Sequence, residues 1–206
     1  MKQLSIFALL LIGAFQFTSC NSTESSDSET EMAEEVLPDG SLALDLDAST
    51  VTWKGVMLGV KEHFGKVALT EANLTIENGK ISGGSFTVDL SSITPEDTTY
   101  DENSTKEKLI GHLQSPDFFH VEEHPTATFV ITGAGEGTVT GDLTIRGITN
   151  QETVKNVEIH TIGGVTNIKG DLTFDRKKYD VSFDVPMKDM VISNDVELQI
   201  SLVAAQ

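Results

Sequence analysis

The chain has 206 residues, of which 32 are Asp or Glu and 14 are Lys or Arg, so its formal charge at pH 7 is −18. A protein with this charge is not expected to attract nucleic acids or anionic lipid headgroups through its general electrostatic field. With one cysteine, Cys20, the chain also lacks internal disulfides and zinc sites built from several cysteines.

The N-terminus has the features of a bacterial export signal. Lys2 precedes an apolar run from Leu4 to Phe17, which has the length of a signal-peptide core and is short for a membrane-spanning helix. The sequence FTSC at residues 17–20 resembles the lipobox of bacterial lipoproteins, in which the cysteine after the cleavage site takes a diacylglycerol. We therefore predict a lipoprotein signal peptide over residues 1–19, lipidation of Cys20 and attachment to a membrane through that cysteine.

Residues 20–40 are rich in Ser, Thr and acidic residues and contain no Lys or Arg. Like charges repel along such a stretch, so it is predicted to be a disordered acidic tether. Acids soon after a lipidated cysteine also resemble the surface-export signals of some Gram-negative lipoproteins. The predicted location is the bacterial cell envelope, with the protein facing the periplasm or displayed outside. The acids are Glu24, Asp27, Glu29, Glu31, Glu34, Glu35 and Asp39.

Residues 41–206 are predicted to form one all-β domain. Apolar residues alternate with polar ones in short runs, which are separated by turn sequences such as Asn78-Gly79. About eight or nine runs predict an antiparallel sheet, and closing it into a barrel removes the exposed edges and encloses space for side chains or one small ligand. The runs lie near residues 50–54, 67–76, 85–90, 128–132, 139–145, 154–159, 172–174, 181–185 and 196–202.

One short helix is predicted between the runs at 85–90 and 128–132. Residues 104–107, with Ser first and Glu last, fit a capping box, and Leu109, Ile110 and Leu113 then share one helical face. The Ser-Pro pair that opens residues 115–119 predicts a second turn, because Ser is a favoured N-cap and Pro a favoured first helical residue.

Residues 120–124 read HVEEH and satisfy the H-x-x-E-H pattern of one group of zinc peptidases. That chemistry requires both imidazoles on one helical face, one turn apart. Pro125 disfavours helical backbone at His124, so the sequence predicts an extended connector here and no metal site. The other histidines that could converge on an ion in space are His63, His112 and His160.

Several segments resemble, in the same order, the motifs of the YceI-like family. One is KLIGHLQSPDFFHVEEHPTATFVITG at residues 108–133, where an apolar helix precedes a Phe-Phe turn and a His-Pro-x-x-x-Phe strand. Family members commonly have an acidic residue at the position of His120 and often an aromatic one at that of His124, which favours a coincidental H-x-x-E-H match. The other segments are STVTWKG at 49–55, His63 with Gly65, GGSFTVDLSSI at 83–93, GDLTIRGIT at 141–149 and FDR at 174–176.

This resemblance, which covers residues 41–206, implies an extended, lipocalin-like antiparallel barrel whose apolar interior takes a long isoprenoid chain. The ligand would be a polyprenyl compound or a quinone, and no other cofactor beyond the lipid anchor is expected. It implies a binding protein that shields or carries a lipid, not an enzyme. The expected ligand-binding residues are Trp53, Phe86, Val88, Leu90, Phe129, Ile131, Leu143, Ile145, Leu172, Phe174 and Phe183.

Two alternatives stay open at this point. A barrel with a solid core would suit a structural or adhesive surface lipoprotein. A metal-dependent hydrolase has less support, because the chain contains no G-x-S-x-G, Walker or EF-hand motif. Arg146 and Arg176, the barrel residues able to grip a phosphate with a bidentate fork, are expected to be structural, which favours an uncharged head such as a quinone. Residues 94–103 are acidic near an expected barrel mouth, and the oligomeric state is left open.

Overall fold

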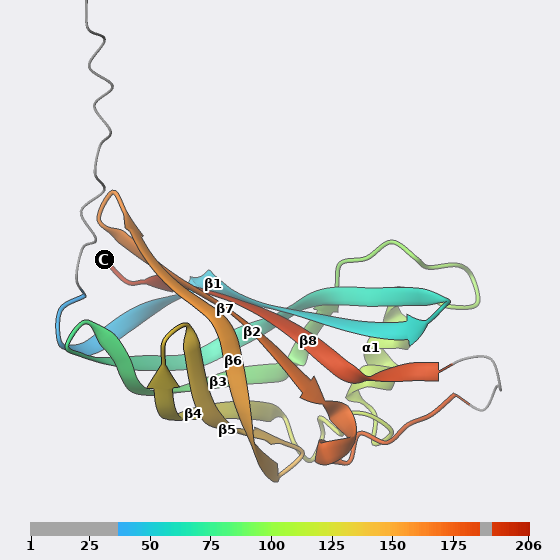
Figure 1. Cartoon of the computed structure of the whole chain (residues 1–206). Coiled ribbons are helices and arrows are strands. Elements are labelled where there is room, and N and C mark those ends of the chain that lie inside the picture. Colours follow the sequence, from blue (N-terminus) through green and yellow to red (C-terminus); the bar gives the residue numbers. More distant parts are fainter. Residues whose placement is uncertain (1–36, 186–190) are drawn as a thin grey trace, which may run out of the picture. The chain divides into compact units, whose positions relative to one another are not determined.

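The structure, a computed structural model, describes residues 37–185 and 191–206. Its elements are β1 (Gly40–Leu58), β2 (Lys61–Glu77), β3 (Lys80–Pro95), α1 (Lys106–Gln114), β4 (Thr126–Gly135), β5 (Thr138–Ile145), β6 (Ile148–Ile162), β7 (Val165–Asp175), the 3-10 helix η1 (Arg176–Tyr179) and β8 (Val191–Ala204). Each strand pairs with its sequence neighbours and β8 pairs with β1, which closes an antiparallel barrel (Figure 1). The predicted barrel of eight strands with one short helix is confirmed.

Closure of the barrel depends on the long first strand. β1 pairs with β2 on one side and with β8 on the other, so Trp53 lies opposite both Gly65 and Leu198. This pairing removes the two edges that an open sheet would expose. Register shifts between Ala43 and Val51 let β1 bend around the barrel.

The core of the barrel follows from alternation along the strands. In β5, Val139, Leu143 and Ile145 are buried, while the threonines between them are half-buried on the opposite face. Successive strand residues point to opposite faces, so this pattern sends one face inward and leaves the other to solvent. The predicted period-two runs therefore correspond to strands with an apolar inner face.

Two tight hairpins use left-handed backbone. Asn78 and Gly79, between β2 and β3, have φ of 52° and 70°, and Arg146 and Gly147, between β5 and β6, have φ of 53° and 73°. Positive φ at both central residues defines the type I′ hairpin, whose twist matches that of the flanking strands. The turn predicted at Asn78-Gly79 is confirmed.

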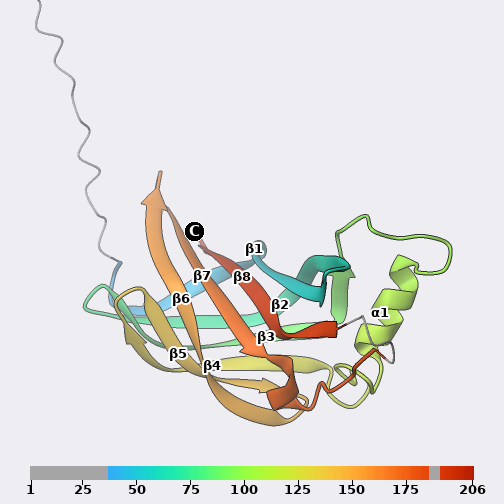
Figure 2. The same ribbon diagram turned by 45° about the vertical axis from the view of Figure 1, so that its right-hand side comes forward.

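The helix α1 packs against β3 at one end of the barrel (Figure 2). Its N-cap is Thr105, whose hydroxyl accepts a hydrogen bond from the Lys108 amide at 3.3 Å. The sequence placed the cap at Ser104, one residue too early. Ser104 is engaged elsewhere, because its amide donates to the Asp101 carboxylate at 2.8 Å and its hydroxyl accepts from the Lys61 ammonium.

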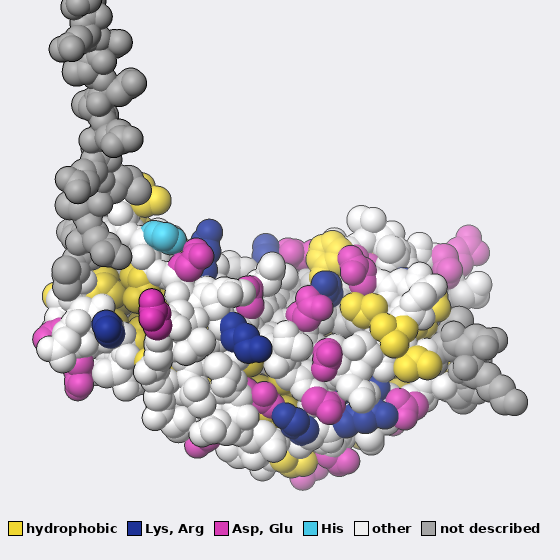
Figure 3. Space-filling model, viewed as in Figure 1, with side chains coloured by type: hydrophobic (Ala, Val, Ile, Leu, Met, Phe, Trp, Pro, Cys, Tyr) yellow, Lys and Arg dark blue, Asp and Glu magenta, His cyan; other side chains and the backbone are white. Residues whose placement is uncertain are grey.

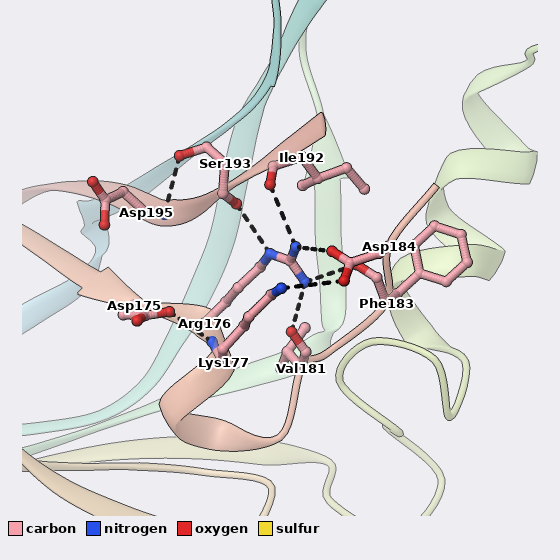
Figure 4. A network of polar contacts seen from close by, with 9 residues as sticks. All are labelled: Asp175, Arg176, Lys177, Val181, Phe183, Asp184, Ile192, Ser193 and Asp195. Carbon is pink, nitrogen blue, oxygen red and sulfur yellow. Dashed lines mark hydrogen bonds and ion pairs between the residues drawn. The ribbon is translucent and has the colours of Figure 1, made fainter. Parts of the chain in front are cut away.

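The predicted run at residues 181–185 is not a strand. Figure 4 shows that the buried guanidinium of Arg176, which is 1% exposed, bonds backbone carbonyls of this segment and of β8. Its Nη1 donates to the carbonyls of Val181 and Phe183 at 2.6 and 2.9 Å, and its Nε donates to the Ser193 carbonyl at 3.0 Å. Because these carbonyls are occupied by a side chain, the segment does not join the sheet.

The barrel begins earlier than the sequence suggested. Leu37 is buried in the core, and the Asp39 carboxylate accepts from the Gly79 amide at 3.3 Å. Residues 37–40, which the sequence predicts to be part of the tether, contact the barrel. The predicted signal peptide, Cys20 and the rest of the tether lie outside the described residues. Within the described ranges, no helix is long and apolar enough to cross a membrane.

Gly65 marks a close approach of β2 and β3. A Cβ at this position would lie 2.0 Å from the Thr94 carbonyl oxygen and 2.7 Å from the Pro95 Cα, and backbone atoms cannot rotate away. We expect Gly65→Ala to lower the free energy of unfolding by roughly 3 kcal/mol. Gly55→Ala in β1, where a Cβ would meet no atom within 4 Å, is the matched control. Urea unfolding compares them, and equal stabilities would contradict the close approach.

Candidate functional site

A cavity of about 170 Å³ lies inside the barrel. All eight strands contribute to its wall, together with Phe119 from the segment between α1 and β4. Lys169 is the one charged residue among the described residues of the wall, and its side chain is exposed. The accessible surface of the cavity is nevertheless entirely apolar. Such a cavity suits a ligand with an apolar body.

Ten of the eleven residues expected to bind a ligand lie on this wall. They come from β1, β3, β4, β5 and β7, which turn the same apolar face inward. The ten are Trp53, Phe86, Val88, Leu90, Phe129, Ile131, Leu143, Ile145, Leu172 and Phe174.

Phe183 is the exception. It belongs to the segment held by Arg176, and its ring lies 4.5 Å from the ring of His112 and 5.7 Å from that of Phe118. The expectation that Phe183 faces the cavity is therefore wrong. The local alternation around it resembles a strand, but the contacts with Arg176 and α1 keep it away from the cavity wall.

The wall also contains residues that were not singled out from the sequence. Val196, Leu198 and Ile200 of β8 show the same alternation as the residues selected, so this pattern could have identified them. Phe119 lies in an irregular segment, and only the path of the chain after α1 brings it to the wall. Regular alternation thus identifies wall residues on strands and misses those on loops.

The interior is hollow in part and not packed solid. Phe86, Val88 and Phe129 lie on the wall yet are only half-buried. The one polar atom of the Trp53 side chain is occupied, because its indole N–H donates to the Lys66 carbonyl at 3.3 Å. The cavity is smaller than the roughly 300–1,000 Å³ of typical ligand pockets. A long ligand therefore requires wall side chains to rotate.

The two barrel arginines are engaged by backbone groups. Nη1 of Arg146 donates to the carbonyls of Pro116, at 2.8 Å, and Phe118, and its Nη2 lies 3.6 Å from the Asp180 carboxylate. Arg176 is held in the network of Figure 4. Neither arginine is on the cavity wall. Their structural role agrees with the sequence expectation.

The acidic segment 94–103 does not present all its charges at a mouth. Asp97 is buried, and its carboxylate accepts from the hydroxyls of Thr99 at 2.7 Å and Tyr100 at 2.8 Å and lies 3.1 Å from Nδ1 of His63. Burial raises the pKa of Asp97, but the hydrogen bonds outweigh it and hold this pKa well below its ordinary value. The stability that the carboxylate adds is complete above about pH 4 and is lost as pH falls further.

Several basic side chains on the outer face are paired with acids. Figure 3 shows Lys and Arg placed singly among Asp and Glu on the face in view. The Lys54 ammonium lies 2.8 Å from the Glu197 carboxylate, and that of Lys66 lies 3.0 Å from Glu96. A face with mixed charges lacks the basic stripe of a nucleic-acid interface, which agrees with the charge of the whole chain.

Residues 120–124 form a tight turn, so the extended connector predicted from the sequence is wrong. The amides of Glu123 and His124 donate to the His120 carbonyl at 3.0 and 2.8 Å, and His120 has φ of 50°. Pro125 restricts only the residue before it, whereas left-handed backbone at His120 closes the turn. In the part of the chain that the structure describes, His120, Glu123 and His124 are the one group of three placed to share an ion.

The other histidines do not converge. His63 contacts Asp97, the ring of His112 packs against Phe118 and Phe183, and His160 lies 3.3 Å from Glu158. These three histidines therefore share no candidate metal site within residues 37–185 and 191–206.

Solved structures of two bacterial proteins show the same fold. BcnA of Burkholderia cenocepacia gives a TM-score of 0.62 at 23% identity, over 79% of this chain and 99% of that one. A polyisoprenoid-binding domain from Saccharophagus degradans gives a TM-score of 0.53 at 13% identity, over 81% and 98% of the two chains.

Comparison of sequences identifies the family. A UPF0312 protein of Staphylococcus aureus strain USA300 is 35% identical over 108 residues, which cover 48% of this chain and 63% of that protein. The match thus spans less than two thirds of that relative. The sequence model of the YceI-like domain matches residues 42–204, which include every strand from β2 to β8 and nearly all of β1. Since this match takes in almost the whole barrel, the chain belongs to the YceI-like family.

Proposed function

We propose that the protein binds a long isoprenoid lipid in its barrel and shields or carries it at the bacterial cell envelope, without covalent chemistry. The observation that carries this proposal is the cavity, whose accessible wall is entirely apolar. An isoprenoid tail is long, slender and apolar, and each buried methylene contributes about 0.8 kcal/mol to binding. The polyisoprenoid-binding domain of Saccharophagus degradans, which shares the fold, supports this choice of ligand.

The head group proposed for the lipid is uncharged or weakly polar, as in a quinone. Both barrel arginines donate to backbone carbonyls and are absent from the cavity wall. A diphosphate head would therefore meet no guanidinium fork there, in a protein whose formal charge is already −18. Affinity is expected to come from the tail.

Titration of a fluorescent isoprenoid into delipidated protein, at low and high salt, tests the head group. We expect similar affinities at both salt concentrations, because burial of the tail is not screened by ions. Arg146→Gln should lower stability and leave the affinity unchanged. Binding that collapses with salt and with Arg146→Gln would show that the ligand has a charged head.

We further propose that the protein is a lipoprotein anchored through Cys20. Two acyl chains from a diacylglycerol, joined by a third on the new amino terminus, would make the attachment effectively permanent. Cys20→Ser should release the protein from the membrane or block its maturation. Cell fractionation and the intact mass of the product measure both effects. A Ser variant that matures normally and stays as membrane-bound as the parent would refute the anchor.

A structural or adhesive surface protein is the second candidate. The small volume of the cavity, about 170 Å³, is the observation that favours it. The two candidates differ in whether lipid co-purifies with the protein. A structural protein would be purified without lipid, whereas a carrier would retain it.

A further inference from the structure

The turn at residues 120–124 brings three metal-binding side chains together on the surface. The ligand atoms of His120, Glu123 and His124 all lie within 4.8 Å of one another. Nδ1 of His120 is already 3.3 Å from the Glu123 carboxylate, and the two imidazole rings are 5.9 Å apart at 78°. We infer that this turn binds one divalent transition-metal ion of the Zn²⁺ class.

The distances suit such an ion. Ligands about 2.0–2.1 Å from a tetrahedral Zn²⁺ lie roughly 3.4 Å from one another. The His120–Glu123 pair has this spacing. Small side-chain rotations would bring the His124 ligand atom to the same spacing. The Glu123 side chain is 66% exposed and the His120 side chain 27% exposed, so both have room to rotate.

Backbone contacts hold the turn without help from an ion. The His120 amide donates to the Ser115 carbonyl at 2.9 Å, and the Val121 amide donates to the Gln114 carbonyl at 2.9 Å. On the other side, the Pro125 carbonyl accepts from the Leu90 amide at 2.8 Å, which fixes the turn to β3. A site whose backbone is already ordered loses less entropy when it binds.

Two neighbouring features leave the site open. Gly147 lies beside the His124 ring, because a Cβ on Gly147 would be 3.5 Å from Cε1 of His124. Arg146 is positively charged and directly precedes Gly147. Its guanidinium contacts the carbonyls of Pro116 and Phe118 and the carboxylate of Asp180. Its charge is therefore engaged away from the three ligands.

The ligand set selects the class of ion. Two imidazoles and one carboxylate suit Zn²⁺, Cu²⁺ or Ni²⁺ better than Mg²⁺ or Ca²⁺, which prefer oxygen ligands only. Three protein ligands on an exposed turn leave the fourth position to water. None of the three residues is on the cavity wall, so the proposed ion is independent of the lipid.

Titration with Zn²⁺, followed by calorimetry, tests the site. The protein should carry no polyhistidine tag, because a tag would itself bind the ion. We expect one Zn²⁺ per chain. His124→Ala and His120→Asn should each weaken binding by more than roughly 100-fold, because changes to residues that only hydrogen-bond to metal ligands already weaken it about 10- to 100-fold. Asn is chosen at residue 120 because it tolerates positive φ.

His160→Ala is the matched control. His160 is also beside a carboxylate, at 3.3 Å from Glu158, but that pair offers only two ligands. Its removal should leave Zn²⁺ affinity unchanged. Each variant should keep the circular dichroism of the parent and its bound lipid. Absence of Zn²⁺ binding, or binding that persists in both His124→Ala and His120→Asn, would overturn the inference.

Discussion

Arg176→Met should lower the free energy of unfolding by about 3–5 kcal/mol. The guanidinium is 1% exposed and donates to the carbonyls of Val181, Phe183 and Ser193. Methionine fills a similar space but offers no donor, so these carbonyls would lose their partner where water has little access. Because these contacts hold the segment at 181–185 and β8 against η1, their loss should also loosen that segment.

Lys177→Met is the control for this effect. The Asp184 carboxylate lies 3.3 Å from Nη2 of Arg176 and 3.1 Å from the ammonium of Lys177. The Lys177 side chain is 40% exposed. An exposed ion pair contributes about 0–1 kcal/mol, so we expect a small change. Urea denaturation of both variants gives the comparison. Similar losses in the two would mean that Arg176 acts through its ion pair and not through the buried carbonyls.

Val88→Trp should abolish retention of the lipid while leaving a folded barrel. Val88 lies on the cavity wall in β3, opposite Leu69 of β2 and Ala127 of β4. An indole at this position would occupy space needed by the tail. Exclusion of two methylenes, at about 0.8 kcal/mol each, weakens binding more than about tenfold. Binding of a fluorescent isoprenoid and circular dichroism measure the two properties.

Thr87→Trp is the control for bulk alone. Thr87 is the adjacent residue, its side chain points to the outer face, and its hydroxyl donates to Glu71 at 3.1 Å. The same indole should leave lipid binding unchanged there. Retention of lipid by Val88→Trp, or its loss in both variants, would contradict binding inside the barrel.

The strands could be predicted because their alternation is local. Along β5 and most of β8, apolar residues that face inward alternate with polar ones, so the sequence alone indicates both the strand and its inner face. Residues 181–185 show the same alternation and are not a strand. What decides their conformation is Arg176, whose contacts with their carbonyls depend on the folded chain and leave no trace in local periodicity.

The candidate site could be predicted in part for the same reason. Alternation selected the inward residues of the strands but could not show whether the interior was filled, because solid and hollow barrels share this pattern. The turn at 120–124 does not follow from the sequence, because Pro125 disfavours helical backbone only at the residue before it. Left-handed backbone at His120, together with hydrogen bonds to the end of α1, determines the turn.

Mass spectrometry of an organic extract measures whether an isoprenoid lipid occupies the barrel. The protein should be purified from its native host in parallel with Val88→Trp, so that lipid carried over from the membrane appears equally in both samples. We expect an isoprenoid lipid in near-stoichiometric amount with the parent protein and its loss from Val88→Trp. An extract without isoprenoid, or with equal amounts from both proteins, would show that the barrel does not hold an isoprenoid lipid.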